Sequence, residues 1–126
     1  NYRIHTDSIK ENIVPTLTDK QKLIVYATED DVINVALFGM TAKEWRENNP
    51  GKEGNIRDYA DILHLVILSN LEVLNASMIE NNISSKDRIE KLNETAKRQM
   101  AILINDNNVI GIERLDNQKL IGDINK

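Results

Sequence analysis

Cysteine is absent from this 126-residue chain, and aromatic residues make up only 4% of it. Without cysteine the chain has no disulfide, no thiolate zinc site and no cysteine nucleophile. An excess of positive charge is also absent, because 16 Lys and Arg stand against 20 Asp and Glu and the pI is about 5.2. Dedicated nucleic-acid-binding domains usually have a pI above ~9, so this balance argues against that class.

No uninterrupted apolar run reaches the ~18 residues of a membrane-spanning helix. The nearest candidate, residues 62–79, contains six polar residues: His64, Ser69, Asn70, Glu72, Asn75 and Ser77. We therefore expect a soluble, cytoplasmic protein without membrane contact. Its length is that of one domain, and because residue 1 is Asn rather than Met, we expect a piece of a longer protein.

Helix starts and stops recur along the chain. Thr18 and Thr41 are each followed three residues later by Gln or Glu, which is the capping-box pattern. Thr28 precedes three consecutive acidic residues, which suit the positive end of a helix dipole. Asn55 and Ser84 are further candidate caps, and no segment before residue 107 alternates with period two. The sequence therefore predicts an all-α fold.

Two long helices are predicted to dominate the fold. Apolar residues recur every three or four positions over residues 56–80 and again over 86–104. The short link between these segments predicts an antiparallel helical hairpin. We expect shorter helices at about 19–27, 29–38 and 42–48 to pack on it. Residues 1–106 would form the helical domain, with 1–17 as a junction from an upstream domain, and 107–126 a weakly structured, irregular tail.

One candidate interaction surface surrounds the turn before the first long helix. Trp45 is either an exposed anchor or an aromatic plug that fixes a short helix on the hairpin, and the plug is the favoured interpretation. Arg57 either reaches a phosphate or forms a local ion pair with Glu44 or Glu53, and we favour the ion pair. The candidate residues are Lys43, Trp45, Arg46, Asn55, Arg57 and Asp58.

A candidate self-association seam lies within the first long helix. A polar Asn in an apolar helix face often fixes the register of helix packing. The helix also has a second apolar face, which includes Leu65 and Val73, so its middle should be covered on more than one side. The seam residues are Asn70, Leu71, Leu74 and Asn75.

Catalytic motifs are missing from the sequence. His64 is interpreted as a packed side chain, because His5 is the only other histidine and a metal site needs more ligands. No Ser-His-Asp arrangement and no phosphate-binding loop is present, so we expect no cofactor, no metal and no enzymatic activity. A ligand-binding or enzymatic site would require Trp45, Arg57 and His64 to converge in one concavity.

Several segments together resemble one family. They are residues 36–46, Asn49-Pro50, 54–60, 68–76, 92–93 and 96–100, with an opening Asn1–Asn12 similar to a domain junction. This pattern resembles the segment that follows the KilA-N domain in phage-type and bacterial KilA-N proteins, over roughly residues 1–100. The resemblance implies a DNA-binding domain upstream of Asn1, and no DNA-contacting residue of that domain maps onto this chain.

Three functions follow as hypotheses. The first is a non-catalytic helical domain for oligomerisation as a homodimer, or for partner docking, in a KilA-N-type protein that binds DNA through its upstream domain. The second is an accessory nucleic-acid-contacting domain that uses Trp45, Arg46 and Arg57 together with Lys43 and Lys52. The third is a small-ligand binder or an enzyme of unknown type.

Overall fold

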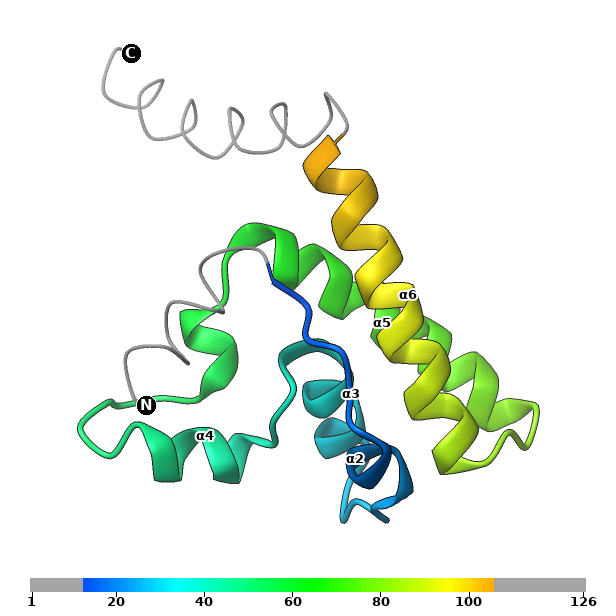
Figure 1. Ribbon diagram of the computed structural model, residues 1–126, viewed down its shortest axis with the longest axis horizontal. Coiled ribbons are helices and arrows are strands. Elements are labelled where there is room, and N and C mark those ends of the chain that lie inside the picture. Colours follow the sequence, from blue (N-terminus) through cyan, green and yellow to red (C-terminus); the bar gives the residue numbers. More distant parts are fainter. Residues whose placement is uncertain (1–12, 106–126) are drawn as a thin grey trace.

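The computed structural model describes residues 13–105, and within that range every regular element is helical (Figure 1). The all-α prediction is therefore confirmed. The elements in chain order are α2 (Asp19–Leu23), α3 (Glu29–Phe38), α4 (Ala42–Asn48), the 3₁₀ helix η1 (Ile56–Tyr59), α5 (Ile62–Glu80) and α6 (Ser85–Asn105).

The predicted caps define where the helices begin. Thr18 and Thr41 each form a complete capping box, and the Thr28 hydroxyl accepts a hydrogen bond from the amide of Asp31. Gly39 ends α3 in the left-handed conformation, with φ of 77°. A Cβ at Gly39 would also lie 2.6 Å from Pro15, so both the backbone and the packing require glycine there.

The first long helix begins six residues later than the sequence pattern indicated. Asn55 forms a capping box with Asp58 and starts only the short helix η1. Asp61 then caps α5 by accepting a hydrogen bond from the amide of His64. The predicted helix 56–80 is therefore divided into η1 and α5, because Ala60 at the end of η1 and the cap residue Asp61 are both extended.

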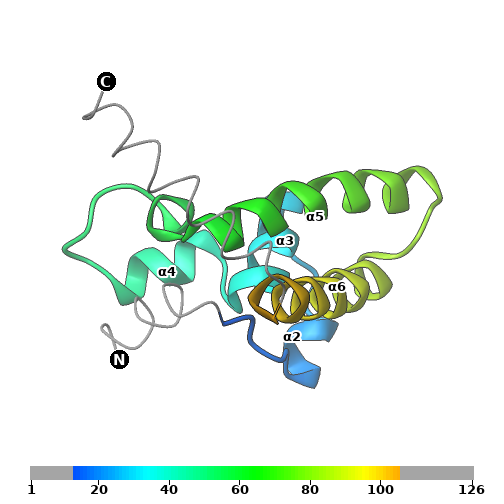
Figure 2. The same ribbon diagram turned by 90° about the horizontal axis from the view of Figure 1, so that it is seen from above.

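α5 and α6 form the predicted antiparallel hairpin (Figures 1 and 2). The link closes through Asn82, whose φ is 59°, and the Ser84 hydroxyl accepts a hydrogen bond from the amide of Asp87. α3 lies against both hairpin helices. These contacts help to bury all seven residues of α3 from Val32 to Phe38.

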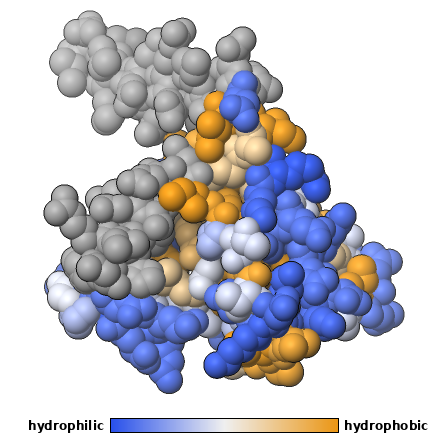
Figure 3. Space-filling model, viewed as in Figure 1, coloured by the Kyte–Doolittle hydropathy of each residue, from blue (hydrophilic) through white to orange (hydrophobic). Residues whose placement is uncertain are grey.

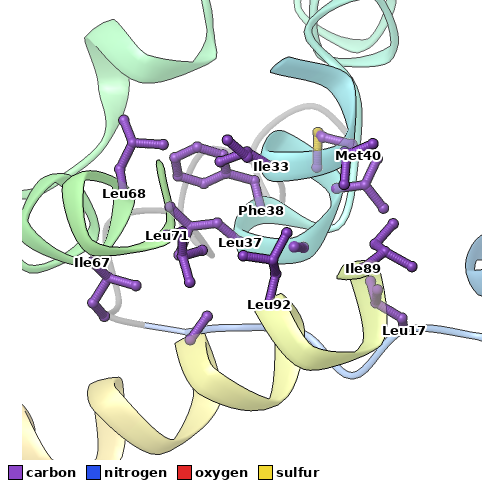
Figure 4. Packing of buried hydrophobic residues seen from close by; sticks show 14 of the residues in the cluster. Leu17, Ile33, Leu37, Phe38, Met40, Ile67, Leu68, Leu71, Ile89 and Leu92 are labelled. Carbon is purple, nitrogen blue, oxygen red and sulfur yellow. The ribbon is translucent and has the colours of Figure 1, made fainter. Parts of the chain in front are cut away.

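The core lies where these three helices meet (Figure 4). Leu37 and Phe38 of α3 point towards Leu71 of α5 and Leu92 of α6. Apolar burial of this kind contributes about 25 cal/mol for each Å² removed from water. α2 and α3 thus pack on the hairpin, as the sequence predicts. α4 lies mainly against η1 instead, and α2 ends at Leu23 rather than near residue 27.

A buried polar network joins the same three helices on the side nearest the hairpin link. Arg88 of α6 is only 7% exposed. Its guanidinium donates to both carboxylate oxygens of Glu29 at the start of α3 and, at 2.8 Å, to Oδ1 of Asn75 in α5. Asn75 Nδ2 donates to Glu29 at 3.0 Å, and Arg88 Nε donates to the carbonyl of Ile83. The charged group is thus surrounded by acceptors from α3, α5 and the hairpin link.

Residues 13–17 form an extended segment that runs beside α3 and α6 (Figure 1). Leu17 lies in the core, and Asn93 of α6 donates to the carbonyls of both Pro15 and Ala36 at 2.9 Å. The described part of the expected junction is therefore packed into the domain. The rest of the junction, residues 1–12, and the expected tail, 107–126, lie outside the described residues.

The Glu29–Arg88 pair predicts a specific response to acid. The hydrogen bond from Arg88 is the largest cause that lowers the pKa of Glu29 below its ordinary value of 4.5. A lowered pKa means that the stabilisation is present above pH 4.5 and is lost as the pH falls through the folded-state pKa. Because the Glu29 side chain is half exposed, we expect Glu29→Gln to cost about 1–2 kcal/mol at pH 7.

Urea unfolding of wild type and Glu29→Gln at several pH values measures this cost. The difference in unfolding free energy should stay constant down to about pH 4.5 and then shrink. Glu94→Gln, which changes an exposed carboxylate on α6, is the matched control and should show neither effect. A difference that persists unchanged into acid would contradict the role of the Glu29 charge.

Candidate functional site

A polar cleft of about 370 Å³ lies between the start of α3, helix α4 and η1. It brings together three of the predicted surface residues, namely Arg46, Asn55 and Arg57. The other lining residues are Thr28, Asp30, Asp31, Asn34, Ala42 and Ile56. The α3 residues of the cleft were not among the predicted surface residues, although the spacing of Asp30, Asp31 and Asn34 places them on one side of a helix.

Arg57 is held in this cleft by two partners on α3. Its Nε donates to Oδ1 of Asn34 at 3.2 Å, and its Nη2 lies 3.4 Å from a carboxylate oxygen of Asp30. The expected local ion pair with Glu44 or Glu53 is therefore wrong, because Arg57 pairs with Asp30, 27 positions earlier in the chain. Asn34 is only 3% exposed, so its carbonyl oxygen depends on Arg57 for a hydrogen bond.

The charges in the cleft are balanced. Two guanidinium groups, from Arg46 and Arg57, stand against the carboxylates of Asp30 and Asp31. The Arg46 guanidinium has no hydrogen-bond or ion-pair partner among residues 13–105. Mixed groups of this kind can recognise polar ligands through hydrogen bonds. They do not create the positive field that attracts a phosphate backbone.

The remaining predicted surface residues lie outside the cleft lining. Trp45 is fully buried, and its ring lies 5.0 Å from that of Tyr59, so it is the aromatic plug rather than an exposed anchor. Lys43 is exposed next to Glu47 on α4. Asp58 accepts a hydrogen bond from the amide of Asn55 and so serves to cap η1.

The predicted seam is divided between the inside and the outside of the chain. Leu71 and Asn75 are buried, because α3 and α6 cover the side of α5 that carries them. They are therefore not available to a second chain. Leu74 is half-buried at the edge of the core, and Asn70 is exposed, where its Nδ2 donates to Gln99 of α6 at 3.0 Å.

Exposed apolar surface lies instead beside Asn70 and at the end of α6. A groove of about 180 Å³ is lined by Val66, Asn70, Gln99, Ile102 and Leu103. Figure 3 shows apolar surface at the end of α6, where Ile102 and Ile104 are 55% and 45% exposed. The second apolar face expected from the sequence, which includes Leu65 and Val73, does not line this groove.

His64 has a structural role. It is fully buried and stacks on Phe38, with ring centroids 5.5 Å apart. Its Nδ1 lies 2.8 Å from Oδ1 of Asp61, and its Nε2 lies 2.8 Å from the carbonyl of Ile13. The ring thus joins the cap of α5 to the extended segment before α2. His64 and Trp45 do not line the cleft that contains Arg57.

In the range that the structure describes, no three His, Asp or Glu side chains are grouped to hold a metal ion. α5 is long and apolar enough to cross a membrane, a test that the core helices of soluble proteins also pass. No protein family, curated protein or solved structure matches the chain.

The Arg57–Asn34 contact predicts unequal effects for the two cleft arginines. Arg57→Ala leaves the buried Asn34 oxygen without its partner, and we expect it to lower the free energy of unfolding by about 1–3 kcal/mol. Arg46→Ala removes an exposed side chain without a partner in the described range, so its cost should stay within ~0.5 kcal/mol. Urea denaturation of both variants measures this difference, and equal costs would contradict it.

Proposed function

We propose that this chain is a non-catalytic helical interaction domain that self-associates within a KilA-N-type DNA-binding protein. The observation that supports the proposal most directly is the surface of α5. Its composition is apolar enough for a membrane-spanning helix, yet only 39% of its most apolar 18-residue stretch is buried inside the chain. Apolar surface beyond what the core uses commonly marks a protein–protein contact.

The link to DNA rests on the sequence resemblance alone. In this proposal the DNA-binding module precedes Asn1, and the helical domain pairs two chains. Pairing makes the second DNA contact intramolecular, which raises the apparent affinity without any new contact to DNA. A domain with this role needs a stable core and one self-complementary surface, and it needs no catalytic group.

The two alternatives have less support. An accessory nucleic-acid surface around Arg46 and Arg57 would need clustered positive charge, but Asp30 and Asp31 line the same cleft. A ligand or enzymatic site built from Trp45, Arg57 and His64 would need these side chains to converge. Two of the three are fully buried away from the cleft.

The solution mass of the 126-residue chain tests self-association. We expect light scattering across a hundredfold concentration range to show a rise from 14.4 kDa towards twice that mass. The mass should rise because a dimer buries the apolar face of α5 between two chains. A constant 14.4 kDa up to high micromolar concentration would contradict the proposal.

A further inference from the structure

The outer face of α5, defined here as Val66, Ser69, Val73 and Ala76, has the spacing of a helix-pairing seam. These positions are three, four and three residues apart, as in the apolar stripe of a coiled coil. Val73 is 73% exposed, and Ser69 and Ala76 are also exposed. Small and β-branched side chains at these positions allow a second helix to approach closely.

This face has no described helix on it. α3 and α6 both lie on the opposite side of α5, as Figure 2 shows. From Ile62 to Ile79 the helix carries a single Asp, Glu, Lys or Arg, namely Glu72. The outer face therefore offers no charge pattern that would select a strongly charged partner.

A protruding side chain and a matching hollow occur together on this surface. Val73 is the most exposed large apolar residue of α5. One helical turn away lies the groove formed by Val66, Asn70, Gln99, Ile102 and Leu103. The groove volume of about 180 Å³ is ample for an isopropyl group. One chain thus carries both halves of a self-complementary contact, which is what a twofold dimer requires.

We propose that a second copy of this chain packs antiparallel on the outer face of α5, and that Val73 of each copy occupies the groove of the other. A twofold axis that passes between Ser69 and Asn70 places residue 66 of one copy opposite residue 73 of the other. Each of these residues then lies about 5 Å from the axis, at 1.5 Å of rise per residue. This inference rests on the proposed function and adds the surface and the geometry of the pairing.

Electrostatics favour the antiparallel arrangement. Opposed helices align their macrodipoles favourably, whereas parallel helices place like ends together. The two Glu72 carboxylates are also separated by about 7–8 Å along the axis in the antiparallel pair, but lie side by side in a parallel pair. A lipid surface is a poorer occupant, because helices that lie on membranes are rich in Lys and Arg and α5 contains neither.

Charge introduced at the centre of the seam tests the inference in the full 126-residue chain. Val73→Glu would place a carboxylate in an apolar groove, so we expect the dimer dissociation constant to rise at least ~100-fold. Val25→Glu is the matched control, since Val25 is 89% exposed on the α2–α3 link, and it should dimerise like wild type. Far-UV circular dichroism verifies that both variants are folded.

The absence of cysteine allows a second test of the register. In an antiparallel pair, Ser69→Cys places two thiols close to the axis, and mild oxidation should give a disulfide-linked dimer. Ala76→Cys lies on the same face, but its two copies would be about 20 Å apart along the axis and should not link. A parallel pair would link both variants.

The outcomes separate this inference from the proposed function. The antiparallel seam is supported if Val73→Glu loses the dimer while Val25→Glu keeps it, and if Ser69→Cys forms the disulfide-linked dimer while Ala76→Cys does not. A wild-type dimer that tolerates Val73→Glu, or one that links at position 76, overturns the seam and leaves self-association standing. A wild-type chain that stays monomeric overturns both, and monomers that bind neutral phosphatidylcholine vesicles through this face would assign it to lipid instead.

Discussion

The buried guanidinium of Arg88 is the constraint on which the arrangement of the main helices depends. A charge that is 7% exposed is costly unless its hydrogen bonds are complete, and here the acceptors come from α3, α5 and the hairpin link. The contact with Asn75 sets the rotation of α5 about its axis. Asn75 and Leu71 face inwards as a result, and Val66, Ser69 and Val73 face outwards.

This rotation connects the core to the proposed function. Because α3 and α6 both cover one side of α5, no helix among residues 13–105 covers its other side, although few of the residues on that side are charged. A lone exposed valine is normal on a protein surface. A stripe of residues at coiled-coil spacing beside an apolar groove, such as the outer face of α5, is less common on a protein that stays monomeric. In the proposed dimer, the stability of the single chain and the pairing of two chains use opposite faces of one helix.

Much of the fold could be predicted from local signals. Thr18, Thr28 and Thr41 mark helix starts because their hydroxyls satisfy backbone amides within the next three residues, and such contacts depend only on nearby sequence. The interruption at Asp61 was missed because apolar spacing continues through it. The cap competes with helix continuation there, and periodicity does not reveal which of them prevails.

The sites were harder to predict, because they depend on contacts between residues far apart in sequence. Arg57 was expected at an interaction surface and lines the cleft, but its partners Asp30 and Asn34 lie more than twenty positions earlier. Two residues of the predicted seam, Leu71 and Asn75, are buried, since Asn75 is drawn inwards by its contact with the buried Arg88. No local pattern records that contact.

The most direct test of the account is an isotope-filtered NOE measurement on a dimeric sample that mixes labelled and unlabelled chains. It detects only contacts between different copies. The account predicts intermolecular NOEs from the methyl groups of Val73 to those of Ile102 and Leu103. Intermolecular NOEs that instead connect other surfaces, with none to Val73, would contradict it.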